Sequence, residues 1–128
     1  LQGEQHYRRT EWAPATAAYT RAVALDTAFA LPLRRMAWMR AFQGGVADSA
    51  SRALGLHAGR LNVGLGVRDS LLVLADSLYF SLGSVTAATA DWGVVRRLFA
   101  TVDEAVRRYP ADPEAWFALA EAREHYGY

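Results

Sequence analysis

The chain lacks cysteine and lysine altogether and carries almost no excess of charge of either sign. Because its 128 residues include no cysteine, disulfides, thiolate catalysis and cysteine-ligated zinc sites are excluded. The 14 arginines nearly balance the 13 acidic residues, and the formal net charge of +1 argues against a dedicated nucleic-acid or membrane-surface binder. Isoleucine is also absent and Asn62 is the only asparagine, a composition that indicates a GC-rich bacterial genome.

Long apolar runs are missing as well. The most apolar stretch, residues 71–82, contains Asp76 and falls short of the roughly 20 apolar residues that a membrane-spanning helix needs. It predicts a buried core helix, and we expect no membrane insertion. The chain begins at Leu1 without a methionine and soon carries Glu4 and Arg8, so we expect no secretion signal. These features predict a fragment of a longer cytoplasmic protein.

Helix-forming residues dominate what is present. Alanine, leucine and arginine are abundant, and no sustained alternation of apolar and polar residues predicts a strand, so the expected fold class is all-α. Glycine, proline and capping residues divide the chain into about seven helices. The expected helices are a short one before residue 10, one over about 11–25, one over about 28–43, one containing Val46 to Leu56, one over about 67–82, one beginning near Asp91, and one over 113–126.

The last two helices have the clearest local signals. The helix after Asp91 has an apolar stripe at three- and four-residue intervals, made of Val95, Leu98, Val102, Ala105 and Val106. Asp112 is a suitable N-cap for the last helix, with Pro113 in its first turn and Glu114 near the positive end of its dipole.

Large and small residues recur in a pattern that resembles the tetratricopeptide repeat. In that repeat two antiparallel helices fill about 34 residues, small residues let the helices cross closely, and large ones fill the groove between pairs. Two segments match well: Pro113, Trp116, Leu119 and Ala120 as a first helix, and Gly3, Trp12, Ala15, Tyr19, Ala22 and Asp26 near the N-terminus. Two match less closely: Leu98, Val102, Ala105 and Pro110, and the set Leu33, Met36, Ala37, Gly44, Ser49, Ala53 and Leu56.

The resemblance implies one domain over residues 1–128, folded as a right-handed superhelix of stacked antiparallel helix pairs. Two repeats would occupy residues 1–61, and a repeat remnant would occupy 94–128. Between them, residues 62–93 depart from the repeat spacing, and 83–90 have the composition of an inserted loop.

Such repeats act as protein-binding scaffolds, so the resemblance implies a non-catalytic protein–protein interaction role. The layout around residues 107–116 is similar to repeat regions behind bacterial serine/threonine kinase or cyclase domains, which implies a sensor or docking segment of a signalling protein. The residues that would line the concave surface and bind a protein or peptide are Glu4, Tyr7, Arg8, Arg34, Arg35, Trp38 and Phe42.

Two details of this surface stay open or depart from known relatives. Trp38 and Phe42 lie one turn apart, and an equally good interpretation is that they pack against the next helix pair. Glu4 and Trp38 stand where some relatives carry the lysine and asparagine of a peptide-carboxylate clamp. A chaperone-tail receptor is therefore not expected.

No pattern of catalytic residues is present, so we expect no enzyme activity and no cofactor. The sequence has no Walker loop and no nucleophile elbow, and Asp69 stands where a dinucleotide-binding loop after Gly64 would need its third glycine. The histidines near carboxylates, His6 and His125, lack the spacing of a zinc-protease helix, so no metal site is expected.

The main alternative is a helical ligand-binding domain of a transcriptional regulator, which would enclose one apolar cavity of several hundred Å³. The paired arginines do not favour nucleic-acid binding, since neighbouring positions on a helix point about 100° apart and acidic residues stand nearby. We expect them to be solvated or paired with carboxylates.

The last helix carries large aromatic residues with no second helix after it. Terminal pairs of a repeat array usually need a polar cap, because each pair covers the apolar face of its neighbour. Trp116 and Phe117 would therefore lie on an uncovered apolar face. We expect homo-oligomers to form through that face, or a continuation of the chain in the full protein to cover it.

Overall fold

The described part of the chain is entirely helical. The computed structural model describes residues 2–45, 48–83 and 89–127, which form seven helices and no strand. The helices are α1 (Gln2–Arg8), α2 (Trp12–Leu25), α3 (Ala30–Gly44), α4 (Ser49–Arg60), α5 (Val67–Leu82), α6 (Trp92–Arg108) and α7 (Pro113–Tyr126). The predicted all-α class is confirmed. Val46, expected within the fourth helix, and residues 84–88 of the predicted insert lie outside the described residues, and α4 begins at Ser49.

Aspartate side chains begin three of the helices, because a carboxylate satisfies free N–H groups of the first turn. Asp48, Asp91 and Asp112 each accept backbone hydrogen bonds there, at distances between 2.8 and 3.3 Å. Pro113 follows Asp112 at the start of α7, where its missing N–H costs little. The predicted starts at Asp91 and Asp112 are therefore confirmed.

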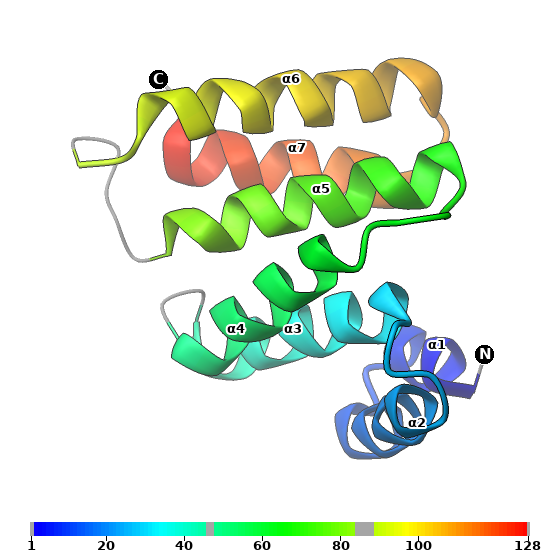
Figure 1. Cartoon of the computed structure of the whole chain (residues 1–128). Helices are drawn as coiled ribbons and strands as arrows, with labels where there is room; N and C mark the ends of the chain where they lie inside the picture. Colours follow the sequence, from blue (N-terminus) through cyan, green and yellow to red (C-terminus); the bar gives the residue numbers. More distant parts are fainter. Residues whose placement is uncertain (1, 46–47, 84–88, 128) are drawn as a thin grey trace.

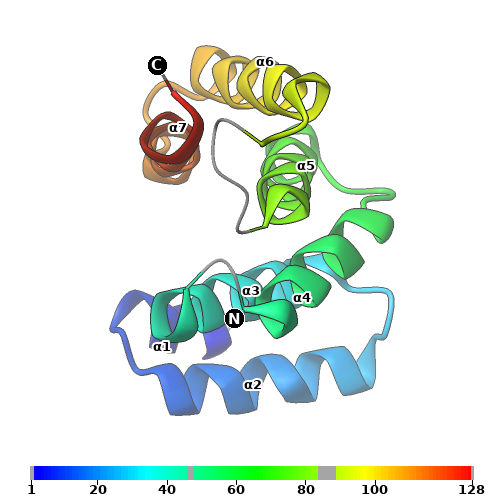
Figure 2. The same ribbon diagram turned by 90° about the vertical axis from the view of Figure 1, so that its left-hand side faces the viewer.

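The helices pack in chain order. Each helix contacts the next one along the sequence, and α5 also contacts α3 and α7. The helices α5, α6 and α7 form one group, α3 and α4 lie beside it, and α2 lies on the far side of α3 and α4, with α1 at the level of α3 (Figure 1). Figure 2 views α5, α6 and α7 nearly end-on and shows α2 at the edge farthest from α6.

The largest apolar core lies where α3, α5, α6 and α7 meet. The predicted burial of α5 is confirmed, since Val73 and Phe80 have no exposed surface. The predicted inner stripe of α6 is also buried, from Val95 to Ala105, and it packs toward α5 and α7.

Gly3 and Gly55 allow unusually close contacts between a helix and an aromatic ring. A Cβ atom on Gly3 would lie 2.6 Å from Tyr19 Cε1, and one on Gly55 would lie 2.5 Å from Phe80 Cδ2. Only glycine fits at such contacts without displacing the ring. The contact of Gly3 with Tyr19 holds α1 against α2, and α1 carries the first residues of the candidate site.

Candidate functional site

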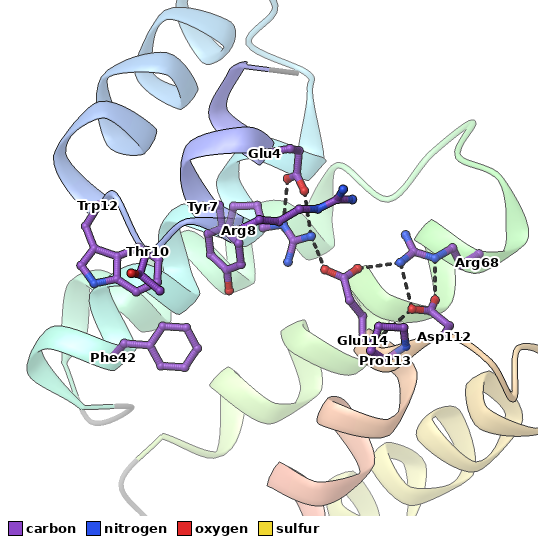
Figure 3. Close-up of a pocket in the computed structure, with 11 residues that line it drawn as sticks. Glu4, Tyr7, Arg8, Thr10, Trp12, Phe42, Arg68, Asp112, Pro113 and Glu114 are labelled. Atoms are coloured by element: carbon purple, nitrogen blue, oxygen red, sulfur yellow. Dashed lines mark hydrogen bonds and ion pairs between the residues drawn. The ribbon is translucent and has the colours of Figure 1, made fainter.

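A hollow of about 580 Å³ opens between α1 and the start of α7 (Figure 3). Side chains from α1, α2, α3, α5 and α7 line it, so residues far apart in the sequence meet there. The lining residues are Glu4, Tyr7, Arg8, Thr10, Trp12, Arg35, Phe42, Arg68, Asp112, Pro113 and Glu114. We call this the first hollow.

Opposite charges alternate across the first hollow, beginning at α1. Arg35 on α3 donates two hydrogen bonds to the Glu4 carboxylate, with Nε–Oε1 at 2.8 Å and Nη2–Oε2 at 2.9 Å. The hydroxyl of Tyr19 donates a third to the same carboxylate at 2.8 Å. Arg35 Nη2 also forms an ion pair with Glu114 at the start of α7. Arg35 therefore links α1 to α7.

Arg68, at the start of α5, continues the series. It pairs with Glu114 at 2.7 Å and with Asp112 at 2.6 Å, and both pairs are drawn in Figure 3. A further pair joins Arg68 to its neighbour Asp69 at 2.9 Å. We call the series Glu4, Arg35, Glu114, Arg68 and Asp112 the ionic row; it joins α1, α3, α5 and α7. Hydrogen-bonded pairs of this kind are stronger and more directional than neutral ones.

A buried ion pair lies beneath the ionic row. Arg34 on α3 and Asp76 on α5 pair through Nε and Oδ2, and the two residues are only 4% and 1% exposed. Burial raises the pKa of the Asp76 carboxyl, and the charge of Arg34 opposes this rise. Arg34 Nη1 also lies 3.5 Å from Glu114, which connects the buried pair to the row.

The carboxylates of the row are held in their charged form. Burial would raise the pKa of Glu114, but the positive charges of Arg34 and Arg35 outweigh it, and the pKa is lowered. The same balance lowers the pKa of Glu4, where hydrogen bonds from Arg35 oppose burial. Hydrogen bonding to Arg68 lowers the pKa of Asp112. Each of these three carboxylates is therefore ionised and already paired with an arginine.

Aromatic rings form the opposite wall of the first hollow. The rings of Tyr7 and Trp12 are 5.5 Å apart, those of Trp12 and Phe42 are 6.0 Å apart, and those of Phe42 and Phe117 are 6.2 Å apart. These spacings are typical of interacting aromatic pairs. The Arg35 guanidinium lies 4.4 Å from the centre of the Tyr7 ring, a cation–π contact. Phe42 remains 49% exposed and presents an apolar surface to the hollow.

A second hollow of about 620 Å³ lies on the other side of the ionic row. It shares Glu4, Arg35, Arg68 and Glu114 with the first hollow, so the two adjoin along the row. The side chains that belong only to the second hollow come largely from α2 and the start of α3. They are Ala18, Tyr19, Arg21, Ala22, Leu25, Phe29, Leu31, Pro32 and Arg34, with Gln2, Gly3 and Asp69. Leu25 is 90% exposed there.

The structure brings most of the predicted concave-surface residues together. Glu4, Tyr7, Arg8, Arg35 and Phe42 all line the first hollow.

The other two predicted residues, Arg34 and Trp38, lie deeper. Trp38 is only 3% exposed because its ring packs against Tyr79, Phe80 and Phe117. Both residues border a smaller recess of about 240 Å³, and Arg34 also lines the second hollow. Because both side chains are buried, the prediction that they offer open binding surface is corrected. For Trp38, the interpretation as packing against the next helices is the one observed.

The prediction for the last helix needs a partial correction. Phe117 does not lie on an uncovered face, since it packs against Trp38 at 5.0 Å and adjoins the largest core. Trp116 is 48% exposed, and its indole N–H donates to the Pro110 carbonyl at 2.8 Å. Only Trp116 of this pair therefore presents a large apolar surface.

Three further site residues were not predicted from the sequence. Arg68 had no assigned role, whereas Asp112 and Glu114 were interpreted only as the cap and the first turn of α7. A charged residue stands in the first turn of both α5 and α7, and these two helices contact each other. The shared position is a signal that could have pointed to a common site.

The described residues were searched for metal-ligating clusters and for helices that could cross a membrane. Among residues 2–45, 48–83 and 89–127, no group of three or more histidine or acidic residues could hold a metal ion. His6 pairs with Glu11 at 2.5 Å, and His125 lies 3.6 Å from Glu121. No helix within those ranges has the length and apolar character needed to cross a bilayer.

Comparisons of this chain with protein-family models, with curated proteins and with solved structures found no match. The two hollows and the ionic row are therefore the features that bear on its function.

Proposed function

We propose that this chain is a non-catalytic scaffold of tetratricopeptide-like helix pairs that binds a segment of another protein in the first hollow. The observation that carries the proposal is the convergence of an aromatic wall, with the half-exposed Phe42 beside the partly buried Trp12, and charged side chains from separate helices. Aromatic residues and arginine are enriched at the centres of protein interfaces, because they offer large rigid surfaces and directional hydrogen bonds.

The order of helix contacts supports the proposed arrangement of pairs. In stacked antiparallel pairs the first helix of each pair contacts the first helix of the next pair. The contacts of α5 with both α3 and α7 have this order, and these three helices supply Arg35, Arg68 and Glu114 to the site. Each further pair in such an array extends the same surface, which suits an elongated peptide.

The state of the carboxylates supports a role without catalysis. A general acid or base needs a free carboxyl whose pKa is matched to the working pH, beside a reactive group. The carboxylates that line the two hollows are Glu4, Asp69, Asp112 and Glu114, and arginine side chains engage each of them. They are suited to holding helices together and orienting a partner.

The alternative, a regulatory domain for a small ligand, would be favoured by an enclosed apolar cavity. Both large hollows instead include exposed residues in their walls, namely Arg8 in the first and Leu25 in the second. A partner that covers an open surface fits these hollows better than a ligand sealed inside the protein.

The test is affinity capture with three forms of the chain. Lysate of a GC-rich bacterium is passed over the wild type, over a variant with Arg8→Ala and Phe42→Ala, and over a control with Val63→Ala and Arg96→Ala. The control residues are exposed and line neither hollow. We expect a partner retained by the wild type and the control but depleted about tenfold or more by the hollow variant.

Two further results decide between the functions. The captured partner should have an unchanged intact mass after incubation, since the scaffold performs no chemistry. Equal retention by all three forms would remove the first hollow from the account. A small molecule that raises the melting temperature without any protein partner would favour the regulatory alternative.

A further inference from the structure

The charges around the two hollows restrict the chemistry of the partner. We propose that the partner is an acidic, amphipathic segment of another protein, whose carboxylates pair with Arg8 and Arg21 and whose apolar side chains occupy both hollows. This proposal rests on the proposed function, because it assumes that a protein segment binds there.

The carboxylates that line the two hollows are already paired. Every acidic residue that lines either hollow is engaged by at least one arginine, and Glu114 is engaged by Arg34, Arg35 and Arg68 together. The surface therefore offers no free carboxylate to a basic partner. A lysine- or arginine-rich segment would have to displace an arginine that is already hydrogen-bonded in place.

Two arginines of the hollows have no carboxylate partner among the residues that the structure describes. Arg8 on α1 lines the first hollow, and Arg21 on α2 lines the second. Both are exposed, and neither forms an ion pair or side-chain hydrogen bond with any residue that the structure describes. Figure 3 draws Arg8 without a dashed line to the other side chains. These two cations are the unsatisfied charges of the surface, and they attract anionic groups.

Each of these two arginines lies in a hollow that also has an apolar wall. Arg8 shares the first hollow with Trp12 and Phe42, and Arg21 shares the second with Leu25 and Phe29. A segment that satisfies each arginine with a carboxylate while covering these walls must carry acidic and apolar residues close together. Apolar burial supplies most of the affinity, and the charges supply orientation and faster association.

The ionic row favours a peptide over a nucleic acid. The two hollows adjoin along the row, so a ligand that spans both passes the carboxylates of Glu4 and Glu114. A nucleic-acid backbone carries a charge at every phosphate, so some of its charges would face these carboxylates. A peptide can place acidic residues beside Arg8 and Arg21 and uncharged residues between them.

The experiment is a selection from phage-displayed random peptides of about 12 residues. Three forms of the full chain serve as targets: the wild type, Arg8→Glu with Arg21→Glu, and a control with Arg96→Glu and Arg97→Glu. The control makes the same change in net charge on exposed arginines of α6 outside both hollows.

On the wild type and on the control we expect enriched peptides to combine aspartate or glutamate with leucine or aromatic residues. A synthetic copy of the most enriched peptide should bind the double Glu variant about tenfold or more weakly, with a smaller dependence on salt. Because both arginines are exposed and unpaired, circular dichroism should show the helical content unchanged. Arg8→Gln with Arg21→Gln repeats the test if charge reversal alters the fold.

The outcomes separate this inference from the proposed function. Enriched peptides that are neutral or basic, or acidic peptides that bind the double Glu variant as well as the wild type, would overturn the inference and leave the scaffold function standing. Recovery of no enriched peptide on any form would count against both. RNA that binds the wild type but not the double Glu variant would replace the peptide as the occupant.

Discussion

The charged residues of the ionic row and those on the outer face of α6 pair over very different lengths of chain. Arg35 and Glu4 are separated by 31 positions, and Arg68 and Asp112 by 44. On α6, by contrast, Arg107 and Arg108 pair with Glu104, three and four positions away. The row therefore connects different helices, whereas the pairs on α6 stay within one.

The two regions also differ in exposure to water. Within the row, the side chain of Arg35 is 11% exposed and that of Arg68 is 41% exposed, and Arg34 beneath the row is 5% exposed. On α6, the side chains of Arg108 and Arg107 are 49% and 69% exposed. Water screens an exposed pair and solvates either partner alone, but a buried partner left alone remains unsolvated. We infer that the ion pairs of the row hold different helices in position, whereas the charged side chains of α6 mainly keep the outer face of that helix hydrated.

The largest loss is expected from breaking the buried pair. Asp76→Asn removes the carboxylate nearest to the buried Arg34, which keeps only its 3.5 Å contact with Glu114, and should lower the free energy of unfolding by about 3 kcal/mol, measured by urea denaturation. The double variant Arg34→Met with Asp76→Leu removes both charges and should recover most of that loss. A loss below about 1 kcal/mol for Asp76→Asn would mean that the pair does not hold α3 against α5.

A smaller loss is expected at the centre of the row. Glu114→Gln removes the charge that Arg34, Arg35 and Arg68 share, and it should lower the free energy of unfolding by about 1 to 2 kcal/mol. A double-mutant cycle with Arg35→Gln should give a coupling energy of about 0.5 kcal/mol or more. Strict additivity of the two changes would show that Arg35 and Glu114 act independently.

The same variant carries a pH signature. The pKa of Glu114 is lowered in the folded chain from an ordinary value of 4.5, so its charge contributes stability above that value and loses it as the pH falls. The difference in unfolding free energy between the wild type and Glu114→Gln should therefore be largest near about pH 7 and shrink toward about pH 3. A difference that stays constant over this range would show that Glu114 does not act through its charge.

The smallest effect is expected on the outer face of α6. Glu104→Gln removes the partner of Arg107 and Arg108, but all three stay solvated, so thermal unfolding should give no resolvable change in Tm. The matched comparison is Glu114→Gln under the same conditions. A fall in Tm as large as that of Glu114→Gln would break the contrast between the two regions.

Much of the secondary structure could be predicted because its signals are local. The starts of α6 and α7 at Asp91 and Asp112 depend on a side chain that caps its own first turn. The inner stripe of α6 follows from three- and four-residue spacing within a single helix. Trp38 shows where this approach stops. The one-turn spacing of Trp38 and Phe42 is compatible with an open binding surface and with packing against the next helices. Only the packing of α5 and α7 decides that Trp38 is buried while Phe42 remains half exposed.

The sequence alone predicts the all-helical class, the starts of α6 and α7, and five of the eleven residues that line the first hollow. The tertiary structure alone decided how their charges pair. From the sequence, Glu114 is a favourable charge in the first turn of α7. In the fold it joins Arg34, Arg35 and Arg68 from two other helices. The physical reason is range: capping and periodicity act within a turn or two of one helix, whereas these ion pairs exist only after helices distant in sequence have packed side by side.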